Sequence, residues 1–164
     1  MIEPNREAIR ILAVLSVLLL PGYATAGTRH GKHPNIYAQR IVDRMVAQNP
    51  EVKSVELSVL SNKGCATLAA TAAEDIGEAC DSDENAPMKT GKPYVEAPTK
   101  NDPVYNITQA LHDASGRLIG AVGMDIAPAH RSPQAVIAQA MTVLREMEQL
   151  IPSKEKLYEP ALPK

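Results

Sequence analysis

The chain has 164 residues, with 17 Lys and Arg against 19 Asp and Glu, 45% hydrophobic residues and only 3% aromatic residues. This length fits one ordinary domain, and a formal charge of -2 gives no electrostatic attraction to a nucleic-acid backbone. Five Tyr with neither Phe nor Trp also leave few aromatic platforms for stacking single-stranded bases. We therefore expect no nucleic-acid partner, and a core built from aliphatic side chains and Met.

The N-terminal segment has the parts of a secretory signal peptide. Arg6 and Arg10 precede an apolar run over residues 11–20, and the Ala-Thr-Ala sequence at 24–26 has the small residues that a signal peptidase recognises. A membrane anchor is the alternative, but the run is shorter than the roughly 20 residues that span a bilayer. We predict a signal peptide over 1–26, a flexible mature N-terminus over 27–35, and a periplasmic or secreted protein that is not membrane-embedded after processing.

The first predicted elements are a helix and a hairpin. Ala38, Ile41, Val42 and Met45 share one face of a helix over about 36–48, which the Asn-Pro pair at 49–50 ends. Residues 54–59 then alternate between polar and apolar, as in a half-buried strand, and the Asn-Lys-Gly sequence at 62–64 turns the chain into a second strand over 65–70.

Residues 71–103 are polar and rich in Pro and Gly. We expect a short helix near 72–77 and then a long loop, with an edge strand at 94–97. Residues 104–112 and 117–126 are stronger strands, because the Asp-Ala-Ser-Gly sequence between them suits a tight turn.

The C-terminal region is predicted to be a helix followed by a tail. Ser132 is a candidate N-cap, Pro133 suits the first helical position, and apolar residues recur at helical spacing to about Leu150. Residues 152–164 are a polar tail that contains Pro. The order helix, hairpin, loop, hairpin, helix predicts an α+β domain with an antiparallel sheet.

Cys65 and Cys80 are the two cysteines of the chain. In an exported protein we favour a disulfide between them, which would close a loop of about 15 residues and stabilise the fold by about 3 kcal/mol. Two free buried thiols, or half of a metal site completed by His, are the alternatives. No Cys-x-x-Cys spacing supports redox or zinc chemistry.

The last predicted strand suggests a binding site. Leu118, Gly120, Val122, Met124 and Ile126 alternate with a shallower set, which is Ile119, Ala121, Gly123 and Asp125. Small residues beside an inward carboxylate leave room for a ligand. Equally, a helix could pack on the small residues while Asp125 caps a turn.

The order of elements and several short sequence motifs resemble those of a Cache domain, which is a PAS-like extracytoplasmic sensor. The likeness covers about residues 34–151, and we place the domain at 36–151. It rests on Asp75-Ile76-Gly77, on the Thr-Gly-Lys-Pro sequence at 90–93 and, most specifically, on 111–125 with its Ile-Gly-Ala-Val-Gly-Met-Asp ending. The resemblance implies a five-stranded antiparallel sheet with a long N-terminal helix on one face, and a ligand pocket on the other face beneath the long loop.

The resemblance also implies ligand-binding residues and a function. The candidates are Asp125 and Tyr105 on the last two strands, and Lys92 and Tyr94 at the end of the loop. Asp125 could receive an ammonium group, and Lys92 could meet a carboxylate. The expected ligand is a small polar metabolite such as a carboxylate, an amine or an amino acid. The chain lacks the Trp and an obvious Arg of amino-acid-binding members, which disfavours an amino acid.

We expect ligand binding to order the 71–103 loop and to be read by a membrane receptor or transporter. The alternative is a structural or assembly protein of the cell envelope with an unoccupied pocket.

Asp81, Asp83 and Asn85 match the first positions of a calcium loop, but Ala86 and Lys92 stand where Gly and Glu are required. We expect no cofactor and no metal, and no catalytic nucleophile beside a base, hence no enzyme.

Overall fold

The computed structural model describes residues 32–161, so the predicted signal peptide lies outside the described residues. Five antiparallel strands form one sheet with the order β2-β1-β5-β4-β3. Their bounds are β1 Val52–Ser61, β2 Gly64–Ala70, β3 Tyr94–Glu96, β4 Tyr105–His112 and β5 Leu118–Ile126. The α+β class, both predicted hairpins and the short edge strand are therefore confirmed.

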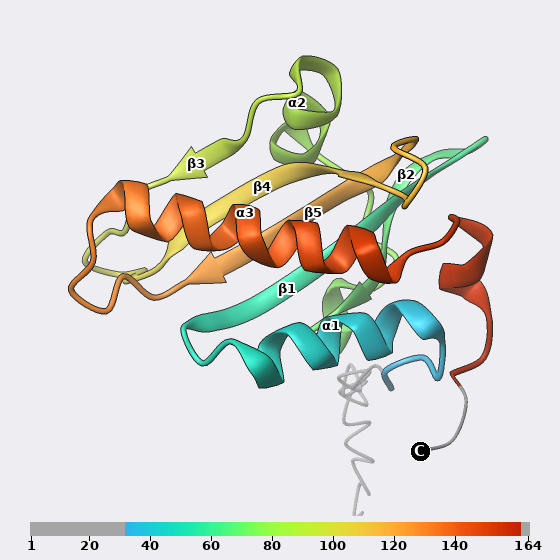
Figure 1. Cartoon of the computed structure of the whole chain (residues 1–164), viewed down its shortest axis with the longest axis horizontal. Coiled ribbons are helices and arrows are strands. Elements are labelled where there is room, and N and C mark those ends of the chain that lie inside the picture. Colours follow the sequence, from blue (N-terminus) through green and yellow to red (C-terminus); the bar gives the residue numbers. More distant parts are fainter. Residues whose placement is uncertain (1–31, 162–164) are drawn as a thin grey trace, which may run out of the picture.

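Two helices cover one face of the sheet. Helices α1 (Tyr37–Gln48) and α3 (Pro133–Leu150) lie side by side across the front of Figure 1. The predicted apolar face of α1 is buried, and Ser132 caps α3 by accepting a hydrogen bond from the backbone N–H of Ala135 at 3.3 Å. Apolar residues of β1, β4 and β5 complete this core: Val55, Leu57, Val59, Ile107, Leu111, Val122, Met124 and Ile126. None of the helices within 32–161 is long and apolar enough to cross a membrane.

A third helix, α2 (Ser82–Thr90), occupies part of the segment that we predicted to be a loop. Its start is a capping box, in which Asp81 accepts a hydrogen bond from the Asp83 N–H at 2.8 Å and Glu84 accepts one from the Asp81 N–H at 2.9 Å. The helix ends at Gly91, whose φ of 68° is left-handed. The short helix predicted near 72–77 is a 3₁₀ turn, Ala73–Asp75.

The residues after α3 are packed against the domain. A 3₁₀ turn, Glu155–Tyr158, buries Leu157 completely, and the Tyr37 N–H donates to the Glu159 carbonyl at 2.8 Å. The Ala161 N–H in turn donates to the carbonyl of Asn35 at 3.1 Å. The predicted polar tail is thus hydrogen-bonded to the N-terminal end of the described residues.

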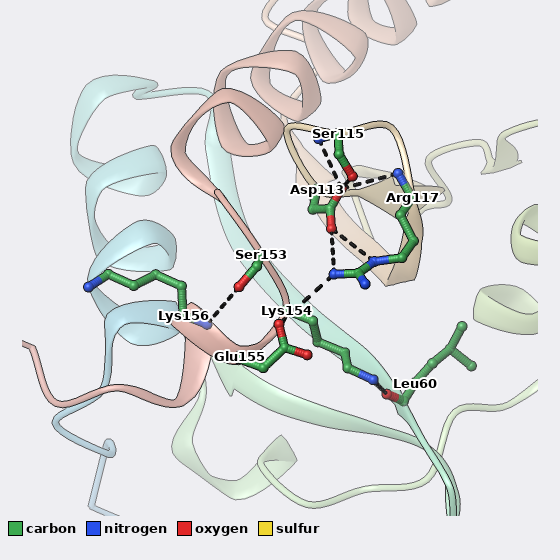
Figure 2. Close-up of polar contacts among 8 residues, drawn as sticks. All are labelled: Leu60, Asp113, Ser115, Arg117, Ser153, Lys154, Glu155 and Lys156. Atoms are coloured by element: carbon green, nitrogen blue, oxygen red, sulfur yellow. Dashed lines mark hydrogen bonds and ion pairs between the residues drawn. The ribbon is translucent and has the colours of Figure 1, made fainter.

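A buried carboxylate in the β4–β5 turn, Asp113, binds Arg117, and Arg117 links the turn to this C-terminal segment (Figure 2). Asp113 is buried and accepts hydrogen bonds from the Ser115 hydroxyl and N–H, from the Arg117 N–H, and from the Arg117 guanidinium. That guanidinium also lies 3.9 Å from Glu155, and Lys154 donates to the Leu60 carbonyl at 3.0 Å. Hydrogen bonds from Ser115 and Arg117 lower the pKa of Asp113 to about 2, although burial opposes the shift.

We expect Asp113→Asn to lower the thermal midpoint at neutral pH, because an amide cannot replace the carboxylate in all of these bonds. In the wild type, the contribution of Asp113 is present above its unfolded pKa of about 3.8 and is lost as the pH falls through about 2. Circular-dichroism melts from pH 7 to pH 2 should therefore show the two proteins converging in acid. A constant difference across this range would contradict the assignment.

Candidate ligand site

The face of the sheet opposite α1 and α3 is polar. Side chains alternate between the two faces along each strand, and the polar ones are paired across neighbouring strands on this face. Asp125 lies opposite Ser54 on one side and Asn106 on the other, and Gly123 lies opposite Glu56 and Thr108. Since directly paired residues share a face, these small, hydroxylic, amide and acidic residues form one continuous surface.

A cavity of about 250 Å³ lies over this surface. Its floor comes from β1, β2, β4 and β5, and its walls come from α2 and the segment that precedes it. The lining residues are Ser54, Glu56, Thr67, Glu78, Ala79, Asp81, Asp83, Glu84, Asn106, Thr108, Gly123, Met124 and Asp125. The pocket expected beneath the 71–103 region is therefore present, with α2 where we expected a loop.

Two neutral donors hold Asp125. The Ser54 hydroxyl donates to Oδ2 at 2.6 Å, and the Asn106 amide donates to Oδ1 at 3.2 Å. Thr108 fixes the orientation of that amide by donating to its oxygen at 3.4 Å. The carboxylate is thus oriented on the cavity floor by groups that leave its charge uncompensated.

Glu56 is the most electrostatically perturbed group of the cavity. Its pKa is raised from 4.5 to about 7, first by burial and then by the nearby carboxylates of Asp75, Glu84 and Asp125. A hydrogen bond with Asp75 contributes in the same direction. This carboxylate would be stabilised by any positive charge that entered the cavity.

The lining carries six carboxylates, which belong to Glu56, Glu78, Asp81, Asp83, Glu84 and Asp125, and among residues 32–161 it includes no Lys, Arg or His. Two of these carboxylates lie on the floor and four on the walls, and no group of three or more His, Cys, Asp or Glu within residues 32–161 could hold a metal ion. The arrangement therefore suits a cation with several atoms better than a single metal ion.

The predicted disulfide is present and supports one wall of this cavity. Cys65 and Cys80 are bonded, with their Cα atoms 5.3 Å apart. Beside the bond, the Cys80 N–H donates to the Cys65 carbonyl at 3.1 Å, and the Thr67 N–H donates to the Glu78 carbonyl at 2.9 Å. Residues 77–80 are thereby held along the outer edge of β2, which places Glu78 and Asp81 at the cavity.

Of the four predicted ligand residues, the structure brings two toward the cavity. Asp125 is on its floor, and Tyr94 lies on the same face, near Asp83 at its edge. The Tyr94 hydroxyl donates to Glu96 at 2.8 Å, and this bond is the main reason that its pKa rises to about 12.

Lys92 and Tyr105 are not brought to Asp125. Tyr105 pairs with Ile126 and packs against the helix-covered core, on the opposite face of the sheet from Asp125. Lys92 is exposed just beyond Gly91 and does not line the cavity. The acidic wall, by contrast, was not among our predicted site residues, although Asp81 and Glu84 have the spacing of a capping box.

No known family model matches the sequence, and no curated protein matches it either. Among solved structures, the chain is similar to a protein described as a GAF sensor from Burkholderia vietnamiensis, with 12% identity, a TM-score of 0.52, and coverage of 72% of this chain and 77% of that chain. It is also similar to the type II free methionine-R-sulfoxide reductase from Thermoplasma acidophilum, with 16% identity, a TM-score of 0.47, and coverage of 74% and 92%.

A third similar structure is the inducer-binding domain of the PobR transcription factor from Acinetobacter, a double mutant in complex with 3-hydroxybenzoic acid. The identity is 12%, the TM-score is 0.44, and coverage is 74% of this chain and 99% of that chain. Of the three likenesses, the first has a TM-score above 0.5, and it establishes a GAF-like and PAS-like fold. At these identities, the chemistry of the site must be argued from the residues of this chain.

Proposed function

We propose that this chain is a non-catalytic sensor-type domain that binds a small organic cation, with one or more ammonium groups, in the acid-lined cavity. The observation that carries this proposal is the set of six carboxylates, with no basic residue among the lining side chains that the structure describes. Of the ligand classes expected from the sequence, the negative charge of the cavity favours an amine and disfavours a carboxylate.

The cavity floor supplies what an ammonium group needs. Asp125 is oriented by Ser54 and Asn106, so it can accept a charge-assisted hydrogen bond without first being reorganised. Hydroxyl and amide groups beside it can accept further N–H bonds. A volume of about 250 Å³ is below the usual range for drug-sized ligands, which favours a compact or slender molecule.

The proposal also includes a role in signalling to a membrane protein. Fold likeness to a protein described as a sensor supports ligand binding as the purpose of the cavity. An exported, Cache-like module would report occupancy to a membrane receptor or transporter through α2 and the preceding segment, which line the cavity and would contact the ligand. An envelope assembly protein remains the alternative, and it predicts no ligand.

The test is a calorimetric and thermal-shift screen of the purified protein against putrescine, spermidine, choline, succinate and Ca²⁺. We expect an amine to bind and succinate to have no effect; a ligand at 100 times its Kd stabilises by about 2.7 kcal/mol. Asp125→Asn should weaken amine binding at least about tenfold through loss of a charge-assisted bond.

Asp102→Asn is the matched control, because it makes the same chemical change on an exposed loop residue outside the cavity lining. It should bind the amine as the wild type does. Binding of succinate in preference to amines, or amine binding that is equally strong in Asp125→Asn, would contradict the proposal.

A further inference from the structure

The disulfide sits where it can control the cavity. Cys65 lies at the start of β2, and Cys80 immediately precedes Asp81, the N-cap of α2. Between them, the Gly77 N–H donates to the Thr67 carbonyl and the Thr67 N–H donates to the Glu78 carbonyl, both at 2.9 Å. A short backbone ladder and the disulfide therefore hold the wall segment, residues 71–81, against β2, and Thr71 at its start is also hydrogen-bonded to Val55 on β1.

Electrostatic repulsion opposes this placement. The wall segment and its continuation into α2 bring Asp75 and Glu84 close enough to Glu56 to raise its pKa, and Glu78 and Asp81 line the same cavity. Within the described part of the chain, no basic side chain lines the cavity to offset these charges. The backbone bonds and the hydrogen bond between Glu56 and Asp75 must resist this repulsion, with the help of the Cys65–Cys80 bond.

The core does not depend on the wall segment. The buried apolar cluster draws on α1, α3, the sheet strands and the C-terminal segment, and it contains no residue of 71–81. Both cysteines are also partly exposed, so a reductant can reach the bond. Releasing the wall should therefore leave the helix-covered face of the sheet intact.

We propose that the Cys65–Cys80 disulfide is a redox switch for the cavity, whose reduction by a dithiol frees the wall segment and weakens cation binding without unfolding the domain. The part that concerns binding rests on the proposed function. A thiolate of the dithiol attacks one cysteine sulfur, the S–S bond breaks, and the other cysteine leaves as a thiolate and takes up a proton. The second thiol of the dithiol then displaces the first cysteine. In total, the protein gains two electrons and two protons, and the dithiol is oxidised to a disulfide.

The first test needs no ligand. Hydrogen exchange of the protein should be compared with and without dithiothreitol, with the backbone amides of Thr67, Gly77 and Cys80 as reporters. We expect these amides to exchange at least about tenfold faster after reduction, while those of Val122 and Met124 on β5 keep their protection. Unchanged exchange at the wall, or loss of protection throughout the sheet, would overturn the switch.

The second test measures spermidine affinity by calorimetry in the same two redox states, with Cys65→Ser/Cys80→Ser as the matched variant. Reduction should weaken binding at least about tenfold, and the variant should bind weakly and show no response to dithiothreitol. Equal affinity in both states would overturn control of binding by the disulfide. If the oxidised protein binds no amine, the proposed function fails, and the exchange measurement still decides whether the bond controls the wall.

Discussion

Gly120→Ala is expected to abolish stable folding, although it adds one methyl group. Gly120 lies on β5 where the pairing with β4 shifts register, and a Cβ built there would lie 1.9 Å from the carbonyl oxygen of Ser58 on β1. That oxygen belongs to the backbone of a neighbouring central strand and cannot rotate away. Separating β1 from β5 should cost about 4 kcal/mol or more, which is comparable to the whole stability of a small domain.

Gly123→Ala is the matched control for this prediction. Three residues along the same strand, its Cβ would meet Thr108 Oγ1 at 3.6 Å, which is ordinary contact. The fold should be retained or stabilised by up to about 1 kcal/mol, since Gly is unfavourable within a strand. Its methyl group would project from the cavity floor, so amine binding should weaken while stability does not.

Chemical denaturation of both variants, read by circular dichroism, distinguishes the two positions. We expect Gly120→Ala to be unfolded or to unfold at much lower urea concentration than the wild type, and Gly123→Ala to unfold at or above the wild-type concentration. A stable Gly120→Ala protein would show that β1 and β5 are not packed as closely as the structure describes.

Much of the fold was predictable because its core elements have strong periodicity. The apolar spacing in α1 and α3 and the alternation in β1, β4 and β5 each match one face of the core. Gly120 was different. The alternation of side chains along β5 puts it on the same face as bulky residues, but it gives no sign that the Ser58 carbonyl lies so close. That contact depends on how closely β1 and β5 approach each other, which no local pattern encodes.

The candidate site was predictable only in part. Asp125 stood out because it follows small residues on an otherwise apolar strand. Tyr105 lies on the core face of the sheet instead, because alternation along β4 puts it on the same side as buried Ile107 and Leu111. The acidic wall was missed because polar composition and Pro87 made α2 resemble a loop, while its capping box was considered only as a calcium motif.

Amine affinity is expected to rise about 100-fold between pH 5 and pH 8 because of Glu56. Its pKa of about 7 means that a proton occupies this carboxyl group at pH 5 and must leave before a cation can pair with it. The nearby carboxylates of Asp75, Glu84 and Asp125 stabilise either a proton on Glu56 or the ammonium group of a bound amine. The proton and the amine therefore compete for the same position. Calorimetry of spermidine across this range should show weak binding in acid and a plateau above pH 7.

The same residue sets the sign of the pH effect on the ligand-free protein. Because the folded-state pKa of Glu56 is raised, the folded state holds a proton that the unfolded chain has lost, and the free energy of unfolding falls as pH rises from about 4.5 through 7. Glu56→Gln should remove this slope and also flatten the pH dependence of amine binding. If the wild-type affinity does not change between pH 5 and pH 8, or if Glu56→Gln retains the full dependence, then Glu56 is not the group that the proton and the amine share.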